Sequence, residues 1–228
     1  MKIQICIPIA AENTSEAIRL IRKAEARGAN LIELRLDYLN DLEGISQIVE
    51  STSLPIIATN RQYEQGGHRP QNEDQRVQAI LDVAGQGFRY VDIELTTAGL
   101  NSVIGELKKM DAKLIVSFHD FKQTPNVTEL KKIVESQMKI GADICKLVTT
   151  ANTIDDGISC LLFTSKMSQK GKVVCFAMGK MGILSRVLCP LFGAHFTYAS
   201  VEKGRETASG QLSISDLKRL YRKLGVEN

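Results

Sequence analysis

Residues 172–178, with the sequence KVVCFAM, form a near-continuous apolar run in this chain of 228 residues, and residues 114–118, LIVSF, form a second one. Runs of this kind are typical of strands that are covered on both faces, as in the parallel sheets of α/β proteins. A longer segment with helical periodicity follows each run. The pattern indicates that strands and helices alternate along the chain.

This alternation occurs eight times. The predicted strands are Ile3–Ile9, Leu31–Asp37, Pro55–Thr59, Tyr90–Leu95, Lys113–His119, Asp143–Val148, Lys172–Met178 and His195–Ser200. The predicted helices are Thr14–Arg27, Asp41–Ser51, Asn72–Gln86, Leu100–Met110, Thr128–Ile140, Thr153–Gln169, Lys180–Phe192 and Ser213–Leu224. We expect the first helix to begin with a Thr/Ser cap, and the last to begin at the capping sequence Ser213-Ile214-Ser215-Asp216.

Eight strand–helix units without a linker predict one α/β domain, residues 1–228, folded as a compact (β/α)8 TIM barrel. A doubly wound open sheet is the alternative. That fold carries a glycine-rich fingerprint after its first strand, whereas Ile9-Ala10-Ala11-Glu12 stands here.

The composition excludes several classes of protein. Hydrophobic residues make up 43% and charged residues 24%, as in folded globular proteins. No apolar run reaches the roughly 18 residues that a membrane helix needs, and the N-terminal segment lacks a signal-peptide pattern. The 29 basic and 26 acidic residues leave a charge of +3, too small to indicate nucleic-acid binding. We therefore expect a small-molecule ligand and no membrane or nucleic-acid partner.

The cysteines and histidines bear on location and on metal binding. The cysteines are Cys6, Cys145, Cys160, Cys175 and Cys189. Their number is odd and no two form a C-x-x-C pair, which predicts reduced thiols in the cytoplasm. Three histidines far apart give no support to a metal cluster, so we expect neither a metal nor a cofactor.

Charged residues occur where the predicted strands end, which in a barrel is where catalytic groups gather. Alternation along the second strand places Glu33, Arg35 and Asp37 on one face. The third strand runs into Arg61, and the fourth carries Asp92. Buried charges are costly unless they are paired or used. A structural ion pair and a functional site both remain open.

Lys146 lies in the middle of a predicted buried strand, where a lysine is rare because burial disfavours the ammonium. It is either a salt-bridge partner or an amine that attacks a carbonyl. His119 ends the preceding strand and could carry a proton. The pair predicts Schiff-base chemistry, which aldolases use to cleave C–C bonds and dehydratases use to remove water. Arg186, in the helix after the seventh strand, could meet an anion.

Six segments resemble the type I 3-dehydroquinate dehydratase family, the third enzyme of the shikimate pathway in aromatic amino acid biosynthesis. They are IELRLDYL (32–39), VDIEL (91–95), VSFHDF (116–121), ADICKLV (142–148), FAMGKMGILSR (176–186) and SGQ (209–211). They stand in the family's order and spacing over nearly the whole chain. The resemblance implies a (β/α)8 barrel, a homodimer and no cofactor.

The resemblance also implies roles for individual residues. Lys146 would form an imine with the C3 ketone of 3-dehydroquinate. His119 would remove the C2 proton and protonate the departing C1 hydroxyl, giving 3-dehydroshikimate and water by syn elimination. The expected substrate-binding residues are Glu33, Arg35, Arg61, Arg186, Thr207 and Gln211, and Arg186 matches the arginine that pairs with the substrate carboxylate. The expected supporting residues are Gln65, Asp92, Met178 and Tyr198, the last two as parts of the wall.

Some positions depart from the family pattern. Gln65 stands where the family often has an acid that orients the histidine, and Glu64 lies one residue too early. Gln65 can still bond to an imidazole but adds no charge, and Asp92 could compensate. Cys6 stands where a serine is common. Two other functions remain open, a Schiff-base aldolase on the same barrel and an inactive barrel that serves as a binding protein.

Overall fold

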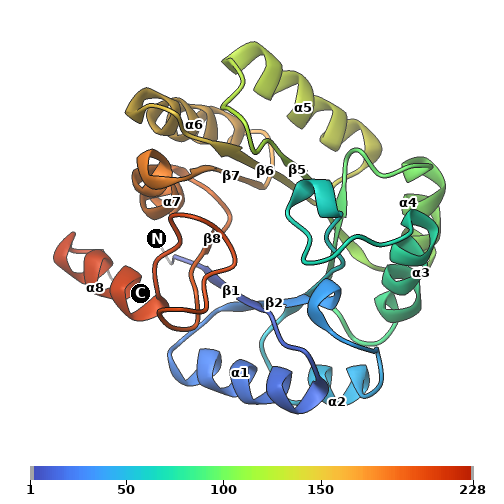
Figure 1. The fold of residues 1–228 in the computed structure, drawn as a ribbon. Coiled ribbons are helices and arrows are strands. Elements are labelled where there is room, and N and C mark those ends of the chain that lie inside the picture. The colour runs from blue at the N-terminus through green and yellow to red at the C-terminus, as the bar shows by residue number, and fades with distance from the viewer. Residues whose placement is uncertain (1–2, 227–228) are drawn as a thin grey trace.

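Eight parallel strands form one sheet that curls into a nearly closed barrel, with the helices around its outside (Figure 1). The computed structural model describes residues 3–226, so both ends of the predicted domain lie outside the described residues. The strands are β1 (Ile5–Ile9), β2 (Leu31–Arg35), β3 (Ile56–Thr59), β4 (Tyr90–Glu94), β5 (Lys113–His119), β6 (Ile144–Thr150), β7 (Val173–Met178) and β8 (Thr197–Tyr198). The predicted TIM barrel is confirmed, and the open doubly wound sheet is wrong.

The sheet order is β7-β6-β5-β4-β3-β2-β1-β8, so each strand lies beside its neighbour in sequence and β8 returns to β1. The two edge strands meet at a seam where the amide of His195 donates to the carbonyl of Val173. Because every pair is parallel, all strands end at the same mouth of the barrel.

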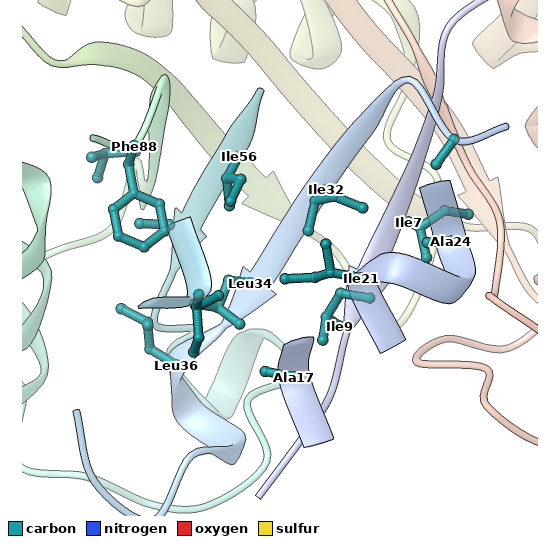
Figure 2. Close-up of a cluster of buried hydrophobic side chains, with 14 of the residues drawn as sticks. Ile7, Ile9, Ala17, Ile21, Ala24, Ile32, Leu34, Leu36, Ile56 and Phe88 are labelled. Carbon is teal, nitrogen blue, oxygen red and sulfur yellow. The ribbon is translucent and has the colours of Figure 1, made fainter. Parts of the chain in front are cut away.

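The helices cover the outer face of the strands. They are α1 (Thr14–Ala26), α2 (Ile45–Glu50), α3 (Glu73–Ala84), α4 (Leu100–Lys109), α5 (Val127–Ile140), α6 (Ile154–Met167), α7 (Ile183–Leu188) and α8 (Ile214–Lys223). Figure 2 shows the packing at α1, where Ala17, Ile21 and Ala24 face the apolar side chains of β1 and β2. Burial of this apolar surface is the main force that holds the helices on the barrel.

Two boundaries and one cap differ from the predictions. The strand Leu31–Asp37 ends at Arg35, and Asp37 lies in a 3₁₀ turn, η1 (Leu36–Tyr38). The helix Asp41–Ser51 begins only at Ile45, because Gly44 adopts the left-handed conformation. The first helix is capped by the side chain of Asn13, not by a Thr/Ser cap. The helix Ser213–Leu224 does have the predicted cap, Ser213.

The predicted helix Lys180–Phe192 is three short pieces, η3 (Lys180–Gly182), α7 and η4 (Cys189–Phe192). A Cβ at Gly182 would lie 2.3 Å from the carbonyl oxygen of Ala177, so this glycine lets the chain turn back tightly against β7. Pro190 lacks the amide that a continuous helix would use, which accounts for the break at η4. The helical periodicity predicted a helical segment here correctly, but it did not predict the turns that divide the segment.

Alternation along the strands separates the inner from the outer face of the barrel. On β6, Cys145 and Leu147 pack outward, whereas Ile144, Lys146 and Val148 face the interior. Apolar side chains close the bottom of the barrel, and the charged ones lie nearer the mouth. This arrangement places the polar site at the ends of the strands.

Candidate active site

One cavity of about 320 Å³ opens at the mouth of the barrel. It is lined by residues from five strands (β2, β5, β6, β7 and β8), from the loops that follow strands, and from α7. The predicted residues along its wall are Glu33, Arg35, Arg61, Gln65, His119, Lys146, Met178, Arg186, Tyr198, Thr207 and Gln211. Asp92, the remaining predicted residue, contacts Lys146 from within the barrel. The fold thus gathers all twelve around one space.

Lys146 is 3% exposed, and its ammonium is held by three oxygens. Nζ lies 2.8 Å from Oδ2 of Asp92, 3.2 Å from Oε1 of Glu33 and 2.9 Å from the hydroxyl of Tyr198. Burial alone would raise the pKa of Asp92, but the charges of Arg61 and Lys146 outweigh it and hold that pKa well below its usual range. The amine therefore faces a permanent carboxylate.

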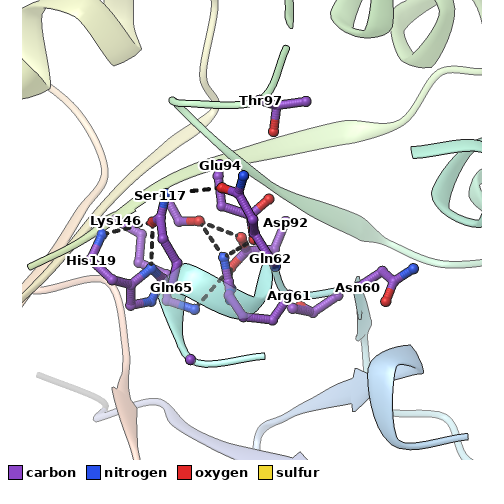
Figure 3. A network of polar contacts seen from close by, with 12 residues as sticks. Asn60, Arg61, Gln62, Gln65, Asp92, Glu94, Thr97, Ser117, His119 and Lys146 are labelled. Carbon is purple, nitrogen blue, oxygen red and sulfur yellow. Dashed lines mark hydrogen bonds and ion pairs between the residues drawn. The ribbon is translucent and has the colours of Figure 1, made fainter. Parts of the chain in front are cut away.

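Arg61, in the loop after β3, lies beside this lysine and contacts side chains of β4 and β5 (Figure 3). Its Nη2 is 2.8 Å from Oδ2 of Asp92, and its Nη1 is 2.7 Å from both Oε1 of Glu94 and Oγ of Ser117. Burial alone would lower the pKa of Arg61, but these carboxylates raise it. Most of its N–H groups are therefore used inside the protein, which leaves few donors for a ligand.

Arg35 and Asp37 form a bidentate ion pair, with Nε to Oδ1 at 2.9 Å and Nη2 to Oδ2 at 2.7 Å. Asp37 also accepts from the amide of His68 at 2.8 Å. Burial would raise the pKa of Asp37, but the ion pair and the backbone amides of His68 and Arg61 lower it. The structural ion pair left open by the sequence is therefore present, and Arg35 reaches the cavity wall beside it.

His119 ends β5 and is oriented by Gln65. Oε1 of Gln65 accepts from the backbone amide of His119 at 3.0 Å and lies 3.2 Å from Nδ1 of its ring. An amide oxygen only accepts, so Nδ1 carries the proton and Nε2 is left as a base. Burial lowers the pKa of His119 well below 6.5, and the positive charges of Arg61 and Lys146 lower it further. The ring is neutral at pH 7.

His119 and Lys146 share the inner face of neighbouring strands. Lys146 is paired in register with Ser117, and His119 follows two residues nearer the mouth. The imidazole therefore stands on the open side of the amine, where a ligand bound to the amine would lie.

Arg186 is a buried cation that forms no ion pair with any residue in 3–226. Within residues 3–226, its Nε and Nη2 have no hydrogen-bond partner, although the guanidinium stacks 4.3 Å from the ring centre of Phe176. Burial lowers the pKa of Arg186 to about 10. A buried planar cation with free donors at a cavity wall suits a carboxylate ligand.

The loop between β8 and α8 closes one side of the cavity. Oε1 of Gln211 accepts from the amide of Thr207 at 2.8 Å, which joins the two predicted residues. Gly210, with φ of +77°, lies so close to Gly179 that a Cβ there would be 2.7 Å from the Gly179 carbonyl oxygen. The loop is therefore seated on the turn after β7.

Comparison with known proteins identifies the family. Residues 5–228 match the model of the type I 3-dehydroquinase family. The chain belongs to this family. A 3-dehydroquinate dehydratase of Dehalococcoides mccartyi is 38% identical over 224 residues, which are 98% of this chain and 97% of that protein. The family resemblance of the sequence is confirmed.

Solved structures agree with the type I 3-dehydroquinase assignment. The 3-dehydroquinate dehydratase from Aquifex aeolicus VF5 superposes with a TM-score of 0.80 at 28% identity, covering 97% of this chain and 98% of that one. The one from Geobacillus kaustophilus HTA426 has a TM-score of 0.89 at 24% identity, covering 98% and 91%, and this likeness supports the fold alone. Family membership favours the dehydratase over the aldolase and the inactive barrel.

The contacts of two residues of this type I 3-dehydroquinase were not predicted from the sequence. Tyr198 was expected only as a wall residue, yet its hydroxyl bonds to Lys146 and Glu33. Glu94 lies in the segment VDIEL (91–95) and no role was predicted for it, yet it holds both Arg61 and Arg76, each at 2.7–2.8 Å. The inward position of both could be predicted from strand alternation, but the partner of each depends on how the strands are staggered.

Within the described part of the chain, no group of three or more His, Cys, Asp or Glu side chains could hold a metal ion. None of the helices in residues 3–226 is long and apolar enough to cross a membrane. Cys6, the other departure from the family pattern, is fully buried, and burial raises the pKa of its thiol.

Proposed function

We propose that this chain converts 3-dehydroquinate to 3-dehydroshikimate and water by syn elimination, with Lys146 as the imine-forming amine and His119 as general base and acid. The observation that carries the proposal is that a buried lysine, a neutral histidine and an unpaired arginine line one cavity of about 320 Å³. These three groups match the ketone, the acidic proton and the carboxylate of the substrate.

The first step joins the substrate to the lysine. The Lys146 amine, once it has lost its extra proton, attacks the C3 ketone, and the resulting carbinolamine loses water to give an iminium ion. The iminium withdraws electrons from C2 and so makes the C2 proton acidic. Asp92, whose pKa is held low, stays ionised beside the nitrogen and stabilises this positive charge.

His119 then carries out the elimination. Its unprotonated Nε2 takes the C2 proton, and the electron pair moves toward the iminium nitrogen to form an enamine. The enamine expels the C1 hydroxyl, which the protonated His119 converts to water. Gln65 keeps the ring in the tautomer that this step needs. Hydrolysis of the remaining imine releases the product and restores Lys146.

The other predicted residues hold the substrate ring. Arg186 would bind the carboxylate with two parallel hydrogen bonds. Glu33 and Arg35 would bind ring hydroxyls, and Arg61 would contribute through the donors that its carboxylate partners leave. Thr207 and Gln211 would close the loop over the ring, and Met178 would form part of the wall. Exclusion of water by this loop would protect the imine from early hydrolysis.

Borohydride trapping tests the proposal. Borohydride added with 3-dehydroquinate should leave one reduced adduct, which peptide mass mapping locates on Lys146, and the absorbance of the conjugated product should appear without borohydride. Lys146→Met should give neither adduct nor product. His119→Asn should still form the adduct, but turnover should fall at least about a hundredfold because the proton carrier is lost.

The outcomes separate the two roles. An adduct on another residue, or product formation by the Lys146→Met variant, would reject the imine mechanism. Unchanged turnover in the His119→Asn variant would reject His119 as the base while leaving the lysine assignment intact.

We also propose that the chain works in the cytoplasm as a homodimer, with residues 1–228 as one catalytic domain of the shikimate pathway. The free cysteines of the described chain suit a reducing compartment. A stripe on α6, formed by Ile154, Ile158 and Leu162 at 53%, 46% and 55% exposure, suits contact with a second copy.

Sedimentation at micromolar concentration tests the dimer. The wild type should sediment as a dimer, and Leu162→Glu should sediment as a monomer because it places a charge in the stripe. Leu224→Glu, at an equally exposed leucine on the distant end of α8, is the matched control and should stay dimeric. A monomeric wild type would reject the dimer, and a dimeric Leu162→Glu would reject this surface.

A further inference from the structure

The hydroxyl of Tyr198 bridges the reactive lysine and its carboxylate neighbour. It accepts from Nζ of Lys146 at 2.9 Å and donates to Oε1 of Glu33 at 3.1 Å. Burial, followed by the nearby charge of Glu33, raises the pKa of Tyr198 well above 10, so the hydroxyl keeps the proton that it donates. Both of its bonds are made inside the protein, and neither points to a ligand.

Tyr198 belongs to one layer of the barrel interior. Side chains from alternate strands fill a TIM barrel in layers of four. Here β2, β4, β6 and β8 supply the members of one such layer, and hydrogen bonds join them: Glu33, Asp92, Lys146 and Tyr198. Such layers are commonly made of bulky aliphatic residues, so three polar partners around one lysine form a specialised arrangement.

The ring of Tyr198 is fixed independently of its hydroxyl. It packs edge-on against Phe176 and Phe196, whose ring centres are 6.2 Å and 5.4 Å away. Nζ of Lys146 lies 4.7 Å from the centre of the Tyr198 ring. A phenylalanine would fill the same space with the same neighbours. Packing therefore explains an aromatic ring at this position but does not explain the hydroxyl.

We infer that Tyr198 is a positioning residue, whose hydroxyl holds the Lys146 amine and the Glu33 carboxylate in the geometry needed for imine formation. The inference rests on the proposed function of Lys146. A lysine side chain has four flexible carbon–carbon bonds, and the hydroxyl on β8 supplies a third fixed point besides the carboxylates on β2 and β4. Fixing the nitrogen in this way favours attack on a carbonyl held in the cavity.

Tyr198→Phe tests the inference because it removes one oxygen and keeps the ring. The rate at which borohydride and 3-dehydroquinate together modify Lys146 should fall about tenfold, the effect of one hydrogen bond to a charged group. The value of kcat should fall similarly. KM should stay within about twofold, since both hydrogen bonds of the hydroxyl are made to protein groups.

Phe196→Leu is the matched control. It loosens the packing against the Tyr198 ring but keeps the hydroxyl, and Phe196 does not line the cavity. Its thermal stability should fall while the trapping rate stays within about twofold of the wild type. If Tyr198→Phe traps at the wild-type rate, or if Phe196→Leu slows trapping equally, Tyr198 acts only through packing and the inference is wrong. Failure of the wild type to trap would instead reject the proposed function.

Discussion

Oε1 of Gln65 accepts two hydrogen bonds from a single residue, His119, at 3.0 Å from its amide nitrogen and 3.2 Å from Nδ1 of its ring. The hydrogen bond from the backbone amide orients the side-chain amide of Gln65, and the hydrogen bond from Nδ1 orients the imidazole. Because the partner is an uncharged amide, it sets the tautomer without stabilising the charged ring. The low pKa of His119, which burial and the charges of Arg61 and Lys146 cause, is therefore not offset by Gln65.

A carboxylate at position 65 should change the pH profile. Gln65→Glu places a negative charge beside Nδ1, which favours the protonated ring and raises the pKa of His119. The base must be neutral to act, so activity is lost as pH falls through that pKa. The acidic limb of kcat/KM, which we expect below pH 6.5 in the wild type, should move up by about one unit.

Glu64→Gln is the control for this experiment, since it changes the charge by one at the neighbouring exposed residue. Its acidic limb should coincide with that of the wild type. A limb that stays in place in the Gln65→Glu variant would show that the titrating group is not His119.

Arg186 should matter for binding and not for folding. Arg186→Met removes a buried cation that has two unpartnered N–H groups and keeps an apolar contact with Phe176. KM for 3-dehydroquinate should rise about a hundredfold, the effect of losing two charge-assisted hydrogen bonds. The thermal midpoint should be unchanged or higher, because an unpaired buried charge opposes folding.

The same change at an exposed arginine, Arg19→Met on α1, should leave both quantities unchanged. Steady-state kinetics and a thermal melt of the wild type and the two variants measure KM and the thermal midpoint. A constant KM in the Arg186→Met variant would mean that another group binds the carboxylate.

Much of the barrel could be predicted because strand alternation is a local property. The strand Lys113–His119 has the predicted bounds, and the inward position of Lys146 follows from its apolar neighbours. The end of β2 could not be predicted in this way. The chain turns at Arg35 because the ion pair with Asp37 and the amide of His68 hold Asp37 in the turn, and the contact with His68 comes from a distant part of the chain.

The candidate residues were easier to predict than their partners. Sequence motifs placed Arg61 among residues that bind the substrate, but the structure shows its guanidinium engaged by Asp92, Glu94 and Ser117. Which side chains meet inside a barrel depends on the stagger of the strands, which alternation does not specify. The free donors of Arg186, by contrast, are visible only once its surroundings are known.

Asp92 should contribute strongly to stability. Its Oδ2 lies 2.8 Å from both Nη2 of Arg61 and Nζ of Lys146, and Asp92→Asn would leave two buried cations without this charge. The free energy of unfolding should fall by about 3–5 kcal/mol, the usual cost of breaking a buried ion pair. Urea denaturation measures this. Asp82→Asn, at an exposed carboxylate on α3, should cost at most about 0.5 kcal/mol, and an equal loss in both variants would contradict the assignment.

The seating of the β8–α8 loop can be tested with two of its glycines. Gly210 has φ of +77° and lies so close to Gly179 that an added Cβ would be 2.7 Å from its carbonyl oxygen, whereas Gly204 has φ of +82° with open space around it. Alanine at either position strains the backbone by about 1–3 kcal/mol, but only Gly210→Ala also pushes the loop off the turn after β7. Because Gln211 follows Gly210 and lines the cavity, kcat/KM should fall at least about tenfold in Gly210→Ala and less than about threefold in Gly204→Ala. Equal losses in the two variants would mean that backbone strain alone, and not contact with Gly179, determines how the loop sits over the cavity.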